Sequence, residues 1–317
     1  MAIADRLTIA VCQMGPVERG VPKRDTVARL TALLEIAAAR GARFCVFPEI
    51  ALTTFFPRWV IDDQAELDAC FEDAMPNSDV QPLFERARAL GIAFALGYGE
   101  RAPVGPDDDD PRHYNTMALV DEQARVTGTY RKVHVPGTIE PVAGLPVQHL
   151  EKRYFRFGDK GFPVWPLLGT RIGLAICNDR RWSETWRVLG LRGAEVVGLG
   201  FNTPVQLADY PEMNHLRGFH HLVGMQAGAY ENGLWIAAAA KAGVEGGMAM
   251  LGVSAIIAPS GEVLAMTASQ GDEVITHDAD LALARRYKTF FDFAANRQPA
   301  AYGPITGPEP GGPGADS

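Results

Sequence analysis

A short apolar run that ends on a cysteine constrains the fold of this chain more than any other stretch. Residues 171–176 read Arg-Ile-Gly-Leu-Ala-Ile, and Cys177 follows directly. Such a run is typical of a strand buried on both faces, as in a parallel sheet covered by helices. Residues 185–191 then have a helical pattern, and Ser183 is expected to cap that helix. The sequence therefore predicts an α/β fold with a cysteine where a core strand ends.

Cys177 has two interpretations at such a position. The helix N-terminus and the neighbouring Arg180 and Arg181 would favour its thiolate form and make it a nucleophile. A free cysteine is, however, often a small buried core residue. The stretch alone leaves both interpretations open.

The rest of the chain repeats the alternation of strands and helices. Strands are expected at 7–14, 43–47, 92–98, 114–121, 125–130, 193–201, 233–240, 251–258, 263–266 and 273–278, and helices at 22–39, 61–73, 80–90, 213–230 and 281–291. No internal linker or repeat interrupts the pattern, so we expect one domain over residues 1–302. Residues 303–317 hold five glycines and four prolines, which predicts a flexible C-terminal tail.

Composition and charge exclude several classes of protein. The net charge of −8 argues against a basic surface for nucleic acid or an anionic membrane, so a small molecule is the expected partner. The four cysteines show no Cys-x-x-Cys spacing, which indicates neither a zinc ribbon nor a disulfide framework. No signal peptide and no bilayer-spanning apolar run is recognisable. We therefore expect a soluble, cytoplasmic protein.

Two groups of residues resemble metal ligands only superficially. The aspartate run at 107–110 lies in an expected hairpin loop, where we interpret it as solvated charge. His215, His220 and His221 lie on one expected helix without a clear third ligand, so we interpret them as structural. Neither a metal nor another cofactor is expected.

Two further charged residues lie at expected strand ends. Glu49 directly follows the strand at 43–47, where burial would raise its pKa and suit it to proton transfer, unless it lies in a surface loop. Lys132 lies two residues after the strand expected at 125–130 and is either exposed or, beside Glu49 and Cys177, a donor to an oxyanion. A base, a donor and a nucleophile are the groups that acyl transfer through a thioester requires.

The three segments that carry these residues read Phe-Pro-Glu, Tyr-Arg-Lys-Val-His and Ile-Cys-Asn-Asp. In this order they resemble the nitrilase superfamily of carbon–nitrogen hydrolases. Within it, the segments similar to the N-carbamoyl-D-amino acid amidohydrolases are 52–59, 149–155, 177–182, 202–204, 219–221 and 225–228. The resemblance runs from about residue 7 to residue 302. It implies a four-layer α-β-β-α sandwich that assembles as a homodimer or homotetramer.

The resemblance also implies a reaction, which is metal-free hydrolysis of an N-carbamoyl amino acid to the free D-amino acid, ammonia and carbon dioxide through a carbamoyl thioester. By position, Cys177 would be the nucleophile, Glu49 the general base and Lys132 the oxyanion stabiliser. Glu151 matches a second glutamate that orients the lysine. The residues that match substrate-binding positions, or that lie beside the oxyanion, are His134, His149, Asn178, Arg180, Arg181 and Asn202.

The two arginines support a carboxylate-bearing substrate on physical grounds as well. Arginine binds carboxylates bidentately, and two adjacent arginines can both point into a site when they lie in a loop. Arg180 could instead pair with a surface acid. Residues 138–147 depart from the family pattern, and a loop there is expected to border the pocket and affect side-chain preference.

Other functions remain open at this point. A β-ureidopropionase, a carbamoylputrescine amidase or a simple amidase would use the same chemistry. A substrate without a carboxylate would leave Arg180 and Arg181 without a purpose. A catalytically silent relative would act in binding or assembly, against which the presence of Glu49, Lys132 and Cys177 argues.

Overall fold

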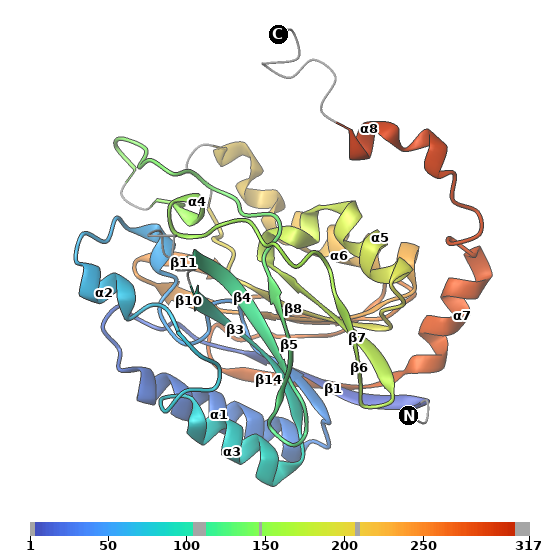
Figure 1. Cartoon of the computed structure of the whole chain (residues 1–317), viewed down its shortest axis with the longest axis horizontal. Coiled ribbons are helices and arrows are strands. Elements are labelled where there is room, and N and C mark those ends of the chain that lie inside the picture. The colour runs from blue at the N-terminus through green and yellow to red at the C-terminus, as the bar shows by residue number, and fades with distance from the viewer. Residues whose placement is uncertain (1–3, 104–111, 146–147, 207–209, 308–317) are drawn as a thin grey trace, which may run out of the picture.

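Two six-stranded sheets lie face to face at the centre of the computed structural model, which describes residues 4–103, 112–145, 148–206 and 210–307 (Figure 1). The first sheet has the order β14-β1-β2-β3-β4-β5 and the second the order β13-β12-β9-β8-β7-β6. In each sheet three neighbouring strands are parallel, β1 to β3 and β7 to β9, and every other strand is antiparallel to the strand that it pairs with.

The strands of the first sheet are β1 (Arg6–Gln13), β2 (Phe44–Val46), β3 (Ala93–Ala102), β4 (Arg112–Val120), β5 (Val126–Arg131) and β14 (Glu273–Asp280). Those of the second are β6 (Val164–Leu167), β7 (Thr170–Ile176), β8 (Val196–Phe201), β9 (Trp235–Ala240), β12 (Ala255–Ile257) and β13 (Val263–Met266). A separate hairpin consists of β10 (Ala242–Glu245) and β11 (Met248–Leu251).

Helices cover the outer face of each sheet. Helices α1 (Lys23–Ala39) and α3 (Gln81–Leu90) pack on the first sheet, and α5 (Ser183–Leu191) and α6 (Arg217–Asn232) pack on the second (Figure 1). This confirms the expected four-layer α-β-β-α sandwich. The remaining helices are α2 (Gln64–Asp68), α4 (Glu151–Tyr154), α7 (Leu281–Phe291) and α8 (Gly303–Thr306).

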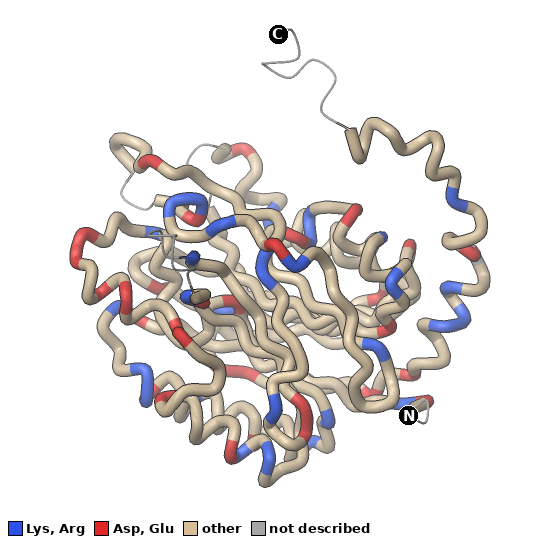
Figure 2. The backbone as a smooth tube through the Cα atoms, in the orientation of Figure 1, with Lys and Arg blue, Asp and Glu red and all other residues tan. Residues whose placement is uncertain are grey.

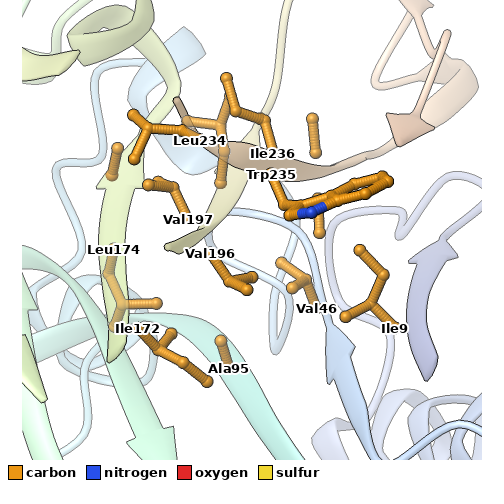
Figure 3. Packing of buried hydrophobic residues seen from close by; sticks show 14 of the residues in the cluster. Ile9, Val46, Ala95, Ile172, Leu174, Val196, Val197, Leu234, Trp235 and Ile236 are labelled. Carbon is orange, nitrogen blue, oxygen red and sulfur yellow. The ribbon is translucent and has the colours of Figure 1, made fainter. Parts of the chain in front are cut away.

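The central core explains why the strands read as continuous apolar runs. On β2, Phe44 and Val46 face the second sheet, whereas Cys45 packs in the cluster formed with α1 and α3. Alternate side chains of one strand therefore enter two different cores, and both faces are buried. Figure 3 shows the inter-sheet core, where residues such as Ile9 and Val46 meet residues of the second sheet.

Most of the expected elements are confirmed, and the differences have local causes. The strand expected at 251–258 is shorter, because Gly252 and Val253 both have positive φ and β12 begins only at Ala255. The helix expected at 213–230 begins at Arg217, after a 3₁₀ turn that starts at Pro211. Of the helix expected at 61–73, only Gln64–Asp68 is helical.

The expected C-terminal tail is described only at its start. Gly303–Thr306 forms the short helix α8, and residues 308–317 lie outside the described residues. A single domain to residue 302 therefore stays a proposal, as does tail flexibility beyond it. The aspartate run at 107–110 also lies outside the described residues.

Charge and hydropathy over the fold agree with the composition. Acidic and basic residues are interspersed along the backbone, and neither sign gathers on one part of the fold (Figure 2). Within the described ranges, no helix has the length and apolar character needed to cross a bilayer.

Candidate active site

Residues from the ends of strands in both sheets meet at one buried site. Glu49 follows β2, Lys132 follows β5 and Cys177 follows β7. The Lys132 ammonium lies 2.7 Å from Glu49 Oε1 and 2.5 Å from Glu151 Oε2, and all three charged side chains are fully buried. The structure therefore brings the four expected catalytic residues into one neighbourhood.

A second group of contacts fixes the two carboxylates around the lysine. Asn115 on β4 donates from Nδ2 to Glu49 Oε1 (2.7 Å). His149 Nε2 lies 3.0 Å from Glu151 Oε1, on the side of that carboxylate away from Lys132. Asn115 was not among the expected site residues, although a polar residue inside an apolar strand is a signal for such a role.

The charges of this network set its protonation states. Burial raises the pKa of Glu49, and the nearby negative charge of Glu151 adds to the rise, while Lys132 opposes it. Burial also opposes ionisation of Glu151, yet Lys132 and His149 together hold its pKa at about 2. Burial works against the Lys132 ammonium, but the two carboxylates raise its pKa above the ordinary lysine value. Of the two carboxyl groups, Glu49 is therefore the one suited to take up a proton and release it again.

Cys177 occupies a sharp turn between β7 and a 3₁₀ turn, Cys177–Arg181. Its φ of +47° is in the left-handed region, which is strained for a residue with a side chain and typical of functional positions. The thiol is 5% exposed and lies 3.5 Å from the Asn202 carbonyl. The turn thus holds the sulfur at the end of the strand, as the sequence predicts.

The electrostatic expectation for Cys177 was wrong. Burial, followed by the negative charge of Glu49, raises the pKa of the thiol, and the opposing effects of Lys132 and Arg180 are smaller. Nor does Ser183 cap the next helix, because Trp182 is the N-cap residue and makes no side-chain capping bond. The resting cysteine is therefore a thiol that needs a base.

Asn202, at the end of β8, joins the base to the nucleophile. Its backbone N–H donates to Glu49 Oε2 (2.9 Å), and its side-chain amide donates to the Glu49 carbonyl (2.8 Å). Its own carbonyl accepts from the Cys177 thiol. Among the described hydrogen bonds none joins the thiol to Glu49 directly, and catalytic contacts of this kind often form only with substrate bound.

The two arginines after Cys177 differ in environment. Arg180 is buried, and its guanidinium donates to the Cys177 carbonyl and to Thr203 Oγ1 (2.7 Å), with one nitrogen 3.7 Å from the sulfur. Burial lowers its pKa to about 10. It is 2% exposed and forms no ion pair with an acid among the described residues, so the alternative of a surface pair does not hold. Arg181 is exposed, and its Nη1 lies 3.3 Å from Asn178 Oδ1.

His134 is held by a residue that sequence reasoning did not single out. Asp179 accepts from the His134 backbone N–H (3.0 Å), and its Oδ1 lies 2.8 Å from Nδ1 of the ring. The same carboxylate accepts from Tyr130 Oη (2.7 Å) and from the Ile176 N–H (2.9 Å). Trp182 stacks on the His134 ring with centroids 4.6 Å apart. Asp179 thus braces the turn that carries Cys177.

Two glycines let the Glu49 turn pack between the sheets. A Cβ on Gly97 of β3 would lie 2.4 Å from the Pro48 carbonyl oxygen, and one on Gly200 of β8 would lie 2.6 Å from the Glu49 nitrogen. Real Cβ atoms do not come so close to backbone atoms, so these positions require glycine.

A cavity of about 710 Å³ opens beside this network. Asn202 and His149 border it on the catalytic side. The other described residues that line it are Phe55, Arg58, Gly137, Thr138, Val142, Leu145, Gln148, Pro204, Gln206, Tyr210, Pro211, Asn214, Gly247, Met248, Ala249 and Met250. Part of the divergent stretch 138–147 thus borders the pocket, as expected, but neither Arg180 nor Arg181 is among these described lining residues.

The histidines of the α6 region have separate surroundings. His221 packs against Phe201 and its Nε2 lies 3.1 Å from the Val253 carbonyl, whereas His215 belongs to the preceding 3₁₀ turn. In the part of the chain that the structure describes, no three His, Cys, Asp or Glu side chains are grouped to hold a metal.

Comparison with known proteins agrees with this geometry. Residues 8–289 match the carbon-nitrogen hydrolase family. The chain is 25% identical to a citrullinase of Francisella tularensis over 291 residues, which cover 89% of this chain and 92% of the relative. It is 27% identical to an N-carbamoylputrescine amidase of Arabidopsis thaliana over 288 residues, which cover 87% and 88%.

Solved structures show the same fold. A carbon-nitrogen hydrolase from Helicobacter pylori superposes with a TM-score of 0.81 at 20% identity, over 96% of this chain and 100% of that one. An amidase from Nesterenkonia sp. superposes with a TM-score of 0.67 at 22% identity, over 93% and 98%.

Proposed function

Because this chain belongs to the carbon-nitrogen hydrolase family, whose chemistry is hydrolysis of amide and carbamoyl compounds, we propose that it hydrolyses N-carbamoyl-D-amino acids. The observation that supports a carboxylate-bearing substrate is the position of Arg180. Its guanidinium is buried, lies 3.7 Å from the thiol and has no acidic partner among the described residues. A buried cation of this kind is stabilised by an incoming anion. The D configuration rests on the resemblance of the segments around Cys177 and Glu151 to D-specific amidohydrolases.

The first half of the proposed reaction forms a carbamoyl thioester. Glu49 takes the thiol proton of Cys177, and the sulfur attacks the carbamoyl carbon. Lys132 and a backbone N–H near Asn178 stabilise the oxyanion. Glu49 then returns the proton to the leaving nitrogen, the carbon–nitrogen bond breaks, and the D-amino acid departs.

The second half regenerates the thiol. Glu49 removes a proton from a water molecule that attacks the thioester, and the sulfur leaves as the thiol. The product is carbamic acid, which decomposes to ammonia and carbon dioxide. In this scheme Glu151 stays ionised and positions Lys132, His149 orients Glu151, and His134 borders the substrate together with Asn202. Arg180 and Arg181 bind the carboxylate.

The test is ammonia release from paired D and L N-carbamoyl derivatives of phenylalanine, methionine and alanine, with N-carbamoyl-β-alanine beside them. We expect turnover of the D series. Turnover of the β-alanine compound alone would place the protein among the β-ureidopropionases and overturn the proposal.

The names of the relatives suggest a second candidate function. A citrullinase and an N-carbamoylputrescine amidase act on compounds with a carbamoyl group at the end of a carbon chain, so L-citrulline and N-carbamoylputrescine belong in the same panel. Turnover of either one without the D series would favour that activity. If all four cysteines react equally slowly with an alkylating reagent and no substrate is hydrolysed, the protein would be a binding protein instead.

We also propose that the protein works as a homodimer or homotetramer in the cytoplasm. Exposed apolar side chains on the outer helix α6, Phe219 and Val223, support assembly. A free catalytic thiol suits a reducing compartment. A monomeric mass in sedimentation at micromolar concentration would contradict the assembly.

A further inference from the structure

The cavity beside the catalytic network contains one unusual wall residue, Arg58. The described residues that line the cavity are mostly apolar, and Arg58 is the only arginine, lysine or carboxylate among them. It ends a 3₁₀ turn, Phe56–Arg58, and its side chain is 1% exposed. Buried arginines ordinarily have all their N–H groups satisfied, and this one does not.

The hydrogen bonds of Arg58 leave part of its guanidinium without a good acceptor. Nη1 donates to the Glu245 carbonyl. Nη2 lies 3.3 Å from Glu245 Oε1 and 3.0 Å from Met250 Sδ, and a thioether is a weak acceptor. Nε has no hydrogen-bond partner, although it is buried. The guanidinium of this cavity-lining residue can therefore donate to a further acceptor.

The carboxylate of Glu245 does not compensate for this, because it is shared among several donors. It accepts from the backbone N–H groups of Phe55 (2.8 Å) and Val17 (2.9 Å), and Lys241 Nζ lies 3.3 Å from it. Arg58, Lys241 and Glu245 are all buried, so the buried group itself holds two cations against one carboxylate, and the exposed Glu18 adds a weaker negative charge near Arg58. An acceptor that carries negative charge would complete it.

We propose that Arg58 is a specificity-determining residue that binds a hydrogen-bond acceptor, preferably a carboxylate, at the far end of the substrate's side chain. This inference rests on the proposed function, which places the carbamoyl carbon at Cys177. Asn202, which contacts that thiol, and Arg58 line the same cavity, so a side chain that leaves the catalytic centre through the cavity passes along its apolar wall to the guanidinium.

The experiment compares kcat/KM for the N-carbamoyl derivatives of D-glutamate, D-glutamine and D-methionine, whose side chains have similar length and differ at the tip. The wild-type protein is expected to prefer glutamate over methionine. In Arg58→Met the glutamate-to-methionine ratio should fall about 10- to 100-fold, with the methionine derivative still turned over. Arg58→Lys keeps the positive charge but lacks the planar guanidinium with its paired N–H donors, so it should retain part of the preference for glutamate over glutamine.

The matched control is Arg86→Met on α3, an exposed arginine that donates to Glu35 on α1 (2.6 Å); neither residue lines the cavity, so the ratio should stay unchanged. A wild-type preference for the methionine derivative would overturn the inference even if Arg58→Met fails to fold. An unchanged ratio in Arg58→Met would overturn it as well. If no D derivative is turned over, the proposed function itself fails, which is a distinct outcome.

Discussion

The reactivity of Cys177 depends on its thiol pKa, on which burial and nearby positive charges have opposite effects. Burial and Glu49 raise the thiol pKa, and Lys132 and Arg180 act against the rise without overcoming it. The same burial raises the pKa of Glu49. The raised pKa makes Glu49 a stronger base than an ordinary carboxylate, and the raised pKa of the thiol makes the nucleophile dependent on that base.

Replacement of the nucleophile should abolish activity without unfolding the protein. Cys177→Ala removes the sulfur, and Cys177→Ser leaves a hydroxyl that Glu49 cannot ionise readily, so ammonia release should drop to background in both variants. Their thermal midpoints should stay within a few degrees of wild type. The control is Cys70→Ala, a buried cysteine whose thiol donates to the Glu66 carbonyl, which should keep its activity. Near-normal turnover in either Cys177 variant would refute the covalent mechanism.

Loss of the base should slow the reaction by about 10²- to 10⁴-fold, or more. Glu49→Gln keeps the shape but cannot take the thiol proton, and its amide would face the donors Lys132 and Asn115. Steady-state kcat gives the measurement. Glu72→Gln is the matched control, since Glu72 is also a buried carboxyl bound to a lysine, Lys23. If both variants lose activity equally, the effect is on stability rather than on catalysis.

The sequence identified the charged members of the site but not the residues that hold them. Glu49, Lys132 and Cys177 could be found because each follows a clear strand pattern. Asn115 lies inside the strand expected at 114–121, and its role depends on β4 lying next to the strand ends. Asp179 braces Tyr130 and His134, which are distant in sequence. Such partners depend on tertiary contacts, which local patterns do not encode.

At the scale of elements, the site depends on how closely neighbouring strands approach the Glu49 turn. Gly97 on β3 and Gly200 on β8 face this turn from the two sheets, and neither has space for a side chain. The position of the general base is therefore set by strands that contribute no catalytic group themselves.

An alanine at Gly200 should disturb the base directly. Its Cβ would lie 2.6 Å from both the Glu49 nitrogen and Met117 Cε, so the turn must shift or the sheets must separate. We expect Gly200→Ala to lower the free energy of unfolding by about 1–3 kcal/mol and to reduce kcat at least tenfold. Urea denaturation and ammonia release measure the two effects. Gly218→Ala on α6 meets no atom within 4 Å and should keep the wild-type kcat without loss of stability, so equal losses in the two variants would contradict the argument.

Periodicity predicted the long elements well and the short irregular ones poorly. The helix expected at 281–291 matches α7, because its pattern is long and regular. The β10–β11 hairpin was missed, although Gly246 and Gly247 both have positive φ and a Gly-Gly pair is a hairpin signal. The strands expected at 233–240 and 251–258 left residues 241–250 between them without an assigned element.

At the scale of the molecule, the active site lies between the two sheets. Glu49 and Lys132 come from the first sheet, and Cys177 and Asn202 come from the second. Strand and helix patterns alone do not determine how two sheets stack, so this part of the fold was predicted only through the family resemblance. The packing between the sheets (Figure 3) thus determines the distance between base and nucleophile.

The buried charges should also give the whole molecule a characteristic acid sensitivity. Lys132 and His149 hold the pKa of Glu151 at about 2, against about 4.3 for an unfolded glutamate. A carboxyl with a depressed folded-state pKa contributes stability above its unfolded pKa, and this contribution is lost as the pH falls from about 5 toward 2. Glu49 acts in the opposite sense, because its raised pKa favours the folded state below pH 4.

Glu151→Gln removes the first of these contributions and should flatten the acid limb of the stability curve. At pH 7 the variant should be less stable than wild type by roughly 2–3 kcal/mol, and the difference should shrink by pH 3. Urea denaturation at pH 7, 5 and 3 measures it, with the exposed Glu140→Gln as the control. Parallel curves for wild type and Glu151→Gln would mean that Glu151 is not held ionised by Lys132 in the folded protein. Of the two carboxyl groups, only Glu49 could then be the ionised partner of the lysine, and it would lose that role each time it took up the thiol proton as the base.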